Sequence, residues 1–307
     1  MTLTNLGVLY YDTHRFADAE ATYTEAAGIR RELAAQNPAA YRPSLAQTLT
    51  NLGNLYVDTH RFTDAETAFK EAAGILRELA AQNPAAYRPG LAQTLNNLGA
   101  LYADTQRLAE AGAALKEAAG IRRELATQNP AVYRPDLALT LNNLGVLYGR
   151  THRFADAETA YNEAAGILRE LAAQDPAAYR PGLAQTLNNL GVLYGRTHRF
   201  ADAETALKEA AGTRRTLAAQ DPAAYRPDLA QTLTNLGALY TDTHRFADAE
   251  TAFKQAVGIL RELAAQNPAA YRPGLALTLN NLALLYHAMH RDSDAKAVEA
   301  EAMMVKL

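Results

Sequence analysis

An asparagine recurs every 46 residues along the chain and is its most regular feature with chemical potential. A carboxamide has two donors and an acceptor, so it can bond both the N–H and the C=O of a peptide backbone. If the units stack at the ~10 Å spacing of packed helices, the ladder could hold an extended chain at about every third residue. It could equally bond a neighbouring helix and fix the stacking angle. The ladder comprises Asn5, Asn51, Asn97, Asn143, Asn189, Asn235 and Asn281.

Further polar residues accompany this ladder. Gln47, Thr50, Asn54 and Asp58 and their counterparts differ between otherwise similar units. At 100° per residue these positions occupy an arc of about 80° on a helix. They form either a binding stripe that varies from unit to unit or a solvent-exposed face that drifts without restraint. A second amide precedes the ladder at Asn96, Asn142, Asn188 and Asn280.

Charge varies at one position of this stripe. Glycine precedes both Arg150 and Arg196 and leaves room beside them. Two such guanidinium groups would suit a carboxylate or a phosphate, although the pair could be one substitution copied with its unit. The series reads Asp12, Asp58, Asp104, Arg150, Arg196, Asp242 and Ala288.

The sequence offers no metal centre and no catalytic group. His287 and His290 stand three residues apart and would chelate a metal only weakly. The only serines are Ser44 and Ser293, there is no cysteine, and no glycine-rich phosphate loop follows a strand pattern. We therefore expect neither an enzyme nor a cofactor. The other histidines lie one unit apart, too far to share an ion, and we expect them in turns: His14, His60, His152, His198 and His244.

Composition narrows the class of partner. Lys and Arg number 30 against 33 for Asp and Glu, so no basic excess favours nucleic acid. No stretch approaches the roughly 18 apolar residues that a membrane span needs, and residue 1 begins inside a repeat without a signal-peptide pattern. We expect a soluble, cytoplasmic protein whose partners include neither nucleic acid nor membrane.

The repeats predict pairs of amphipathic helices. Leu45, Leu49, Leu52 and Tyr56 follow helical spacing, as do the apolar residues from Ala65 to Leu79, with a turn at 59–62 between the two runs. All twelve prolines lie in six junctions such as 83–89. We expect the first proline of each junction to end one helix and the second to begin the next, with a short linker between them.

The expected fold is an all-α solenoid in which seven 46-residue helix-turn-helix repeats form a superhelix, because so short a unit must bury its apolar face against its neighbours. We count one domain, 1–307. Its units span approximately 1–36, 37–82, 83–128, 129–174, 175–220, 221–266 and 267–307.

The unit resembles a tetratricopeptide repeat. The family's order of bulky residue, Leu-Gly, Tyr, aromatic, Ala, aromatic and Ala matches Leu49, Leu52, Gly53, Tyr56, Phe62, Ala65, Phe69 and Ala72. The unit departs from the family in having Leu49 at the usual Trp position and in its length of 46 rather than 34 residues. We expect a second helix that continues to about Gln82 and an expanded linker. Long units of this kind resemble kinesin light chain repeats and arrays in bacterial multidomain signalling proteins.

This resemblance implies a concave groove lined by the first helices, where proteins of the family bind ligands. The implied function is a protein- or peptide-binding scaffold with an asparagine-lined groove. A structural spacer or self-associating rod is one alternative, and a sensor arm of a larger bacterial signalling protein is another. The groove residues would be the ladder with Asn96, Asn142, Asn188, Asn54, Asp58, Asp104, Arg150, Arg196 and Asp242.

The first and last repeats differ from the others, and two positions alternate between successive repeats. Asp292 and Glu299 replace the usual aromatic residues of the last unit and suggest a C-terminal cap, whereas the first helix lacks its opening turn and could associate with another copy. Two positions also alternate, which suggests that a block of 92 residues multiplied. They read Arg30, Leu76, Arg122, Leu168, Arg214, Leu260 and Ser44, Gly90, Asp136, Gly182, Asp228, Gly274.

Overall fold

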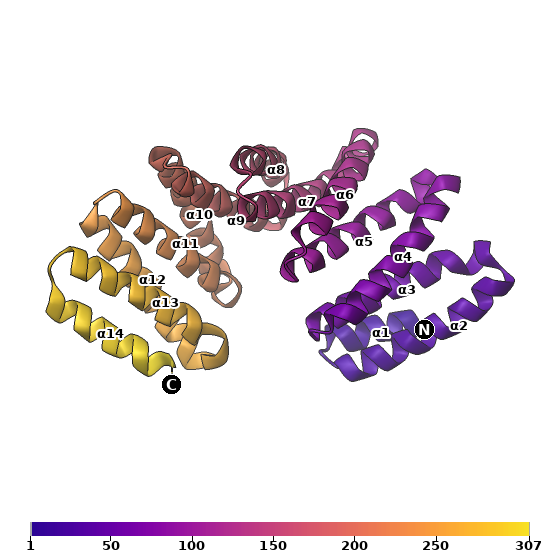
Figure 1. Cartoon of the computed structure of the whole chain (residues 1–307), viewed down its shortest axis with the longest axis horizontal. Coiled ribbons are helices and arrows are strands. Elements are labelled where there is room, and N and C mark those ends of the chain that lie inside the picture. The colour runs from indigo at the N-terminus through magenta and orange to yellow at the C-terminus, as the bar shows by residue number, and fades with distance from the viewer. Residues whose placement is uncertain (1, 307) are drawn as a thin grey trace. The chain divides into compact units, whose positions relative to one another are not determined.

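Helices are the only regular elements in the computed structural model, which describes residues 2–306 (Figure 1). The all-α expectation is confirmed, and the helices alternate between a first and a second member of each pair. The first helices are α1 (Leu3–Asp12), α3 (Pro38–Asp58), α5 (Pro84–Asp104), α7 (Pro130–Arg150), α9 (Pro176–Arg196), α11 (Pro222–Asp242) and α13 (Pro268–Ala288). The second helices are α2 (Phe16–Gln36), α4 (Phe62–Gln82), α6 (Leu108–Gln128), α8 (Phe154–Gln174), α10 (Phe200–Gln220), α12 (Phe246–Gln266) and α14 (Asp292–Lys306).

The expected linker between units is wrong, because the proline junction belongs to the first helix. A single residue, Asn83, separates α4 from α5, and its side-chain oxygen accepts a hydrogen bond from the backbone N–H of Ala86 at 3.2 Å. Pro84 occupies the first helical position, where its missing N–H has no helical partner to lose. The asparagine cap and this proline therefore start the helix, and Pro89 lies inside it.

The turn within each pair agrees with the sequence. His60 adopts φ 58°, the left-handed conformation, and the N–H of Arg61 bonds the carbonyl oxygen of Tyr56 at 2.7 Å. The histidines are thus turn residues, as expected. Positive φ angles occur at His14, His60, Gln106, His152, His198, His244 and His290.

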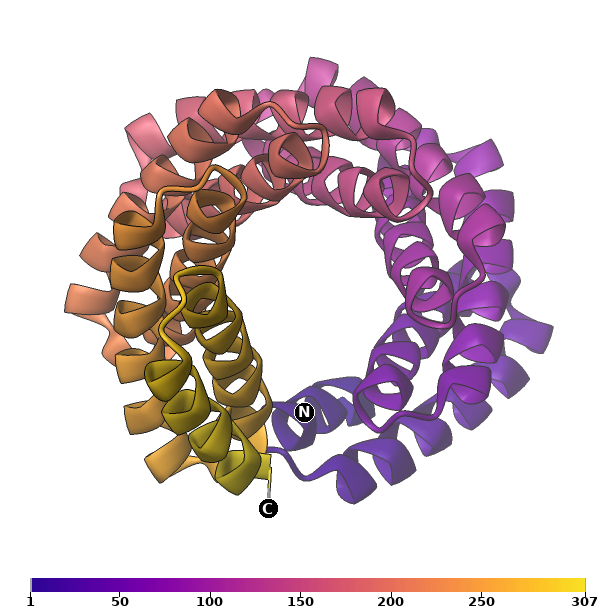
Figure 2. The ribbon, with the colours of Figure 1, turned by 60° about the vertical axis from the view of Figure 1, so that its left-hand side comes forward.

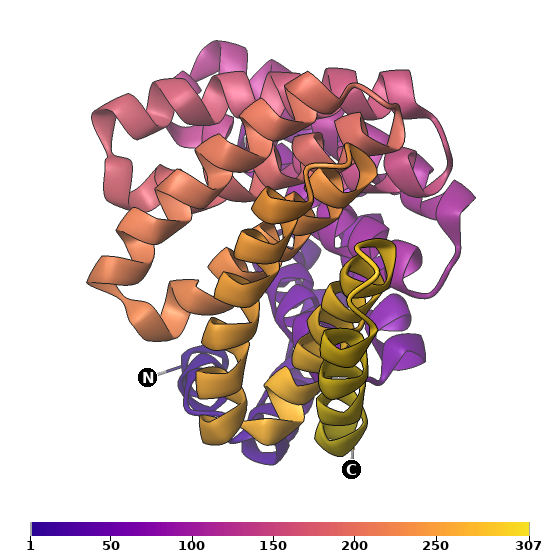
Figure 3. The ribbon, with the colours of Figure 1, turned by 90° about the vertical axis from the view of Figure 1, so that its left-hand side faces the viewer.

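The described chain divides into two compact units, one ending at Arg153 and one beginning at Phe154. Within each compact unit every helix packs on the next helix, so each helix pair contacts the pairs that precede and follow it in the sequence. First helices also approach one another, as α3 and α5 do, whereas second helices of successive pairs do not among the described residues. Each unit therefore has an inner layer of first helices and an outer layer of second helices (Figure 2). At the yellow end of the chain, α13 and α14 lie side by side (Figure 3).

Glycine allows the two helices of a pair to approach closely. A Cβ added to Gly53 would lie 2.5 Å from the Phe69 ring, closer than any real contact. The last pair has Ala283 and Glu299 at these two positions, and Glu299 contacts His287. The same close approach occurs at Gly7 with Tyr23, Gly99 with Leu115, Gly191 with Leu207 and Gly237 with Phe253.

The alternating positions define two kinds of junction between pairs. Arg122 is 1% exposed and donates to the Asp136 carbonyl oxygen at 2.9 Å and to Thr140 Oγ1. The Asp136 carboxylate lies 3.8 Å from the same guanidinium. At the preceding junction, Leu76 lies against Gly90, with 3.5 Å between its Cδ2 atom and a Cβ added there. Leucine thus accompanies glycine at its three junctions, whereas arginine accompanies aspartate at two junctions and serine at the first, where Arg30 bonds the Ser44 carbonyl oxygen at 3.1 Å.

We predict that Gly237→Ala lowers the free energy of unfolding by about 1–3 kcal/mol, because its methyl group would lie 2.6 Å from the Phe253 ring. Gly258→Ala is the matched control, since nothing lies within 4 Å of its Cβ position. The control should gain roughly 0.5–1 kcal/mol from better helix formation. Urea unfolding followed by circular dichroism measures both, and equal stability of the two variants would contradict the close approach.

We also predict that the alternation reflects energetic coupling. Arg122→Leu leaves the Thr140 and Gln93 acceptors without their donor, and Asp136→Gly removes a carboxylate beside a buried guanidinium. The double variant reproduces the Leu76–Gly90 junction and should be more stable than the sum of the single changes predicts, by about 0.5–3 kcal/mol. A double-mutant cycle in urea tests this prediction, and strict additivity would disprove it.

Candidate functional site

The asparagine ladder lies on the inner layer of each compact unit. Asn5 is exposed, and the other ladder residues are half-buried. The preceding amides Asn96 and Asn188 are buried, at 4% and 3% exposed. Asn54 is half-buried. The charged positions are exposed, namely Asp58, Asp104, Arg150, Arg196 and Asp242.

In the first compact unit, a hydrogen-bonded network connects the ladder to the buried guanidinium of Arg122. Arg122 donates to Gln93 Oε1 at 2.7 Å, and Gln93 Nε2 donates to Asn97 Oδ1 at 2.9 Å. Asn97 Nδ2 in turn donates to Asn54 Oδ1 on the neighbouring first helix at 2.8 Å. One further bond crosses to α7, from Asn143 Nδ2 to Asn96 Oδ1 at 3.2 Å.

The second unit repeats this arrangement. Arg214 donates to Gln185 Oε1 at 2.6 Å, Gln185 donates to Asn189 Oδ1 at 3.1 Å, and Asn235 donates to Asn188 Oδ1 at 3.0 Å. These bonds between first helices are the ones that a stacking role requires. Each uses one N–H of Asn97, Asn143 or Asn235, and a carboxamide has two. In these three residues the bond between first helices therefore uses only one of the two amide N–H groups.

The charged positions are divided between the two compact units. Asp58 accepts a hydrogen bond from the hydroxyl of Tyr11, whose pKa rises to about 12 through burial and this bond. Arg150 and Arg196 belong to different compact units. The Arg196 guanidinium lies 5.0 Å from the centre of the Phe154 ring.

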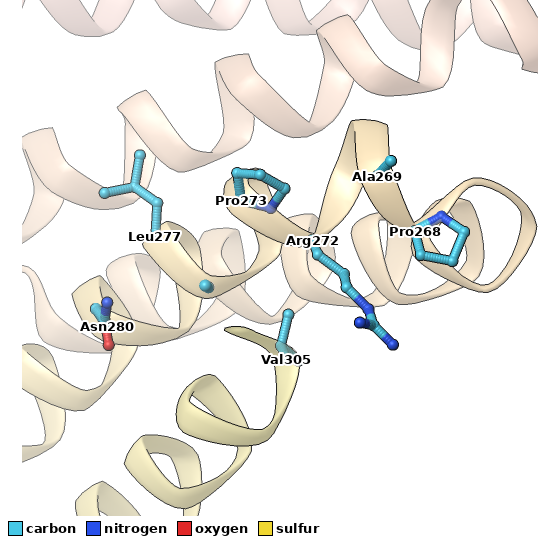
Figure 4. Close-up of a pocket in the computed structure, with 8 residues that line it drawn as sticks. Pro268, Ala269, Arg272, Pro273, Leu277, Asn280 and Val305 are labelled. Atoms are coloured by element: carbon cyan, nitrogen blue, oxygen red, sulfur yellow. The ribbon is translucent and has the colours of Figure 1, made fainter. Parts of the chain in front are cut away.

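Exposed apolar side chains on the first helices were not predicted from the sequence. They include Leu139, Val146 and Val192, and the two most exposed are leucines of α13. Leu277 and Leu284 on α13 are 60% and 66% exposed, and they occupy the stripe positions of Gln47 and Asn54. A hollow of about 740 Å³ is lined by residues of α13 between Pro268 and Asn280, Leu277 among them, and by Val305 of α14 (Figure 4). Leucine at two expected polar positions, seven residues apart on one helix face, was the signal that could have found them.

At the turn end of the repeats, ionic contacts join successive pairs. Glu66 on α4 accepts bonds from Arg107 at 2.5 Å and from the Tyr102 hydroxyl at 3.2 Å, and its carboxylate lies 2.6 Å from Lys70 Nζ. Arg107 also lies over the Tyr102 ring, 4.3 Å from its centre. Arg107, followed by Lys70, lowers the pKa of Glu66 to about 2. We call this arrangement the clasp, and it recurs around Glu204 and Glu250.

Comparison with known families identifies the repeat. Tetratricopeptide repeat models match residues 1–78 and 90–170, and a second set matches 183–222 and 229–267. The chain belongs to the tetratricopeptide repeat family. No curated protein matches it.

Solved structures agree with the tetratricopeptide fold. BtubC (BKLC) from P. vanneervenii is 26% identical, with a TM-score of 0.64 over 81% of this chain and 91% of that one. A putative kinesin light chain from Podosopora anserina with nearly identical repeats is 14% identical, with a TM-score of 0.55 over 73% and 98%. A signal transduction ATPase from Pyrococcus horikoshii with a tetratricopeptide repeat sensor is 12% identical, with a TM-score of 0.72 over 98% and 41%.

In the last tetratricopeptide repeat, a histidine near the end of α13 contacts two acidic residues of α14. His287 Nε2 lies 3.0 Å from Glu299 Oε1, and its Nδ1 lies 3.2 Å from Asp292 Oδ1. The acids expected to act as a cap thus bind a residue of their own pair.

Among the described helices, none is both long and apolar enough to cross a membrane.

We predict that Glu299, followed by Asp292, raises the pKa of His287 above its ordinary value of about 6.5. Because the folded pKa is raised, the stabilisation is complete below pH ~6.5 and is lost as pH rises through the folded value. NMR titration of the His287 ring measures this pKa. Glu299→Gln should lower it, because the variant loses the carboxylate beside the ring. An unchanged His287 pKa in the variant would show that the contact carries no charge interaction.

Proposed function

We propose that this chain is a non-catalytic protein-interaction scaffold that binds an extended peptide or protein segment along its first helices. The proposal includes a cytoplasmic location and no cofactor, nucleic acid or membrane partner. The observation that carries it is the coexistence, on the inner layer, of backbone-binding amides with exposed apolar side chains. Asn281 and Leu284 represent the two kinds on α13. Membership of a repeat family without catalytic machinery supports the same function.

The second compact unit offers the better-defined part of this surface. Asn281 has no side-chain hydrogen-bond partner among the residues described, and Leu277 and Leu284 are exposed on the same helix. Exposed leucines of this size are unfavourable in water, and a ligand that covers them gains roughly 1.5–3 kcal/mol for each side chain buried. The favoured ligand therefore supplies a backbone for the amides and an apolar side chain for the two leucines.

Head-to-tail self-association is less well supported. Inside the array, the arginine that begins a second helix pairs with a glutamate of the preceding pair, as Arg245 does with Glu204 at 2.7 Å. In a second copy that continued the array, the arginine would be Arg15, and the residue at the glutamate position is Lys296. Two like charges would meet there, which disfavours this contact.

We predict that Leu277→Ser together with Leu284→Ser weakens binding at least tenfold, since 1.4 kcal/mol corresponds to a factor of ten. Peptides would be selected from a random library on the immobilised protein, and the dissociation constant of the best one measured by calorimetry. Met303→Ser is the matched control, because Met303 is 68% exposed on α14, outside the inner layer. Equal losses in the control, or none in the leucine variant, would contradict the proposed surface.

We predict that the double variant Asn235→Ala, Asn281→Ala binds the same peptide about 5- to 140-fold more weakly, because each of the two lost hydrogen bonds contributes roughly 0.5–1.5 kcal/mol and 1.4 kcal/mol is a factor of ten. Helix content should not fall, since alanine is the better helix former. Calorimetry and thermal unfolding would be measured on the same samples. If the variant binds as tightly as the parent but melts earlier, the ladder serves stacking and not ligand binding.

A further inference from the structure

One junction of the array lacks the glutamate on which the clasp is built. The clasp position reads Glu20, Glu66, Gly112, Glu158, Glu204 and Glu250 along the second helices that precede another pair. Gly112 on α6 therefore removes a carboxylate that every other such junction has. The cationic and phenolic partners of that carboxylate remain in place as Lys116, Arg153 and Tyr148.

A hollow occupies the place of the missing side chain. It has a volume of about 430 Å³, and Gly112, Lys116, Tyr148 and Arg153 are among the residues that line it. The Arg153 guanidinium lies 4.4 Å from the centre of the Tyr148 ring, and Lys116 Nζ lies 6.0 Å from it. Two cations thus lie against one ring beside an open space.

The lysine of this junction differs from its counterparts. Lys70, Lys208 and Lys254 lie 2.6, 2.6 and 2.7 Å from the carboxylate of their clasp glutamate. Within the described part of the chain, no carboxylate pairs with Lys116. An ammonium group beside a second cation attracts an anion more strongly than either group alone.

Arg153 can bind an additional carboxylate whatever else it contacts. In the equivalent clasp, Arg107 directs Nη1 to Glu66 at 2.5 Å while its Nε bonds Glu110 at 2.7 Å. A guanidinium has five N–H donors in a planar fork, so it can bind two carboxylates at once.

We propose that the hollow at Gly112 binds a carboxylate group, which takes the place of the absent glutamate between Lys116, Arg153 and the Tyr148 hydroxyl. The internal copies of the clasp define this chemistry, because the same three partner types bind a glutamate carboxylate around Glu66 and Glu204. The carboxylate is either a small free anion or an acidic side chain of a bound protein.

The backbone can also accept the missing side chain. A Cβ added at Gly112 would lie 3.5 Å from Leu147 Cδ2, an ordinary van der Waals contact. Gly112→Glu should therefore fill the hollow with a carboxylate of the chain's own and raise the melting temperature. The variant becomes an internal competitor for any external ligand.

The experiment is an NMR titration of the whole chain at constant ionic strength. The probes are acetate, N-acetylglutamate amide, N-acetylglutamine amide and inorganic phosphate. We expect saturable shifts of the amide signals around Gly112, Lys116 and Tyr148 with acetate or the glutamate derivative and none with the glutamine derivative. Gly112→Glu and Lys116→Gln should each abolish the shifts, whereas Lys208→Gln, the matched control at a junction that keeps its glutamate, should not.

The outcomes separate the sources of the carboxylate. Equal binding of acetate and the glutamate derivative supports a free anion, and binding of the glutamate derivative alone supports an acidic side chain from a partner. Tighter binding of phosphate overturns the assignment to carboxylates. The proposal also fails if neither carboxylate gives saturable shifts, or if the shifts persist in folded Gly112→Glu or Lys116→Gln.

Discussion

The packing of successive pairs is determined by how closely the two helices of one pair approach each other. A ring such as Phe69 reaches the backbone of the first helix only because Gly53 has no side chain. This contact fixes how the pair presents its remaining apolar face, and that face can be buried only against the next pair. The register of the polar groups follows from the same geometry. Clasps join residues 36 and 41 positions apart, and every successive pair must pack alike for them to form.

The inner layer is joined energetically to the core. Arg122 is buried between pairs, yet its hydrogen bonds continue through Gln93 to Asn97 and Asn54 on the surface of the first helices. Removing a partner from a buried guanidinium is costly, so the network holds its amides in fixed orientations. A ligand that bonded these amides would meet groups already oriented, which reduces the entropy lost on binding.

The helices and turns could be predicted from the sequence, whereas the junctions and contacts between repeats could not. The period, the helical spacing and the turn at His60 all emerged from local patterns, because local patterns determine them. The second proline of each junction led to a wrong helix start. Pro89 was predicted to begin the helix, but Asn83 followed by Pro84 is the stronger start signal, and the helix begins there. The network from Arg122 to Asn97 could not be predicted, because it depends on the angle at which helices from different repeats cross. Leu277 and Leu284 were visible in the sequence but were overlooked, because their positions were represented by the polar residues Gln47 and Asn54 of one repeat.

The pairing of Arg122 with Asp136 and of Leu76 with Gly90 spans the boundary between repeats. Losing the single repeat 83–128 would place leucine beside aspartate, and losing 129–174 would place a buried arginine beside glycine. Losing both together restores a matched boundary. Removing 92 residues therefore leaves these boundaries matched, whereas removing 46 leaves a mismatched one, and the smallest length change that the packing accepts without a further substitution is a double repeat.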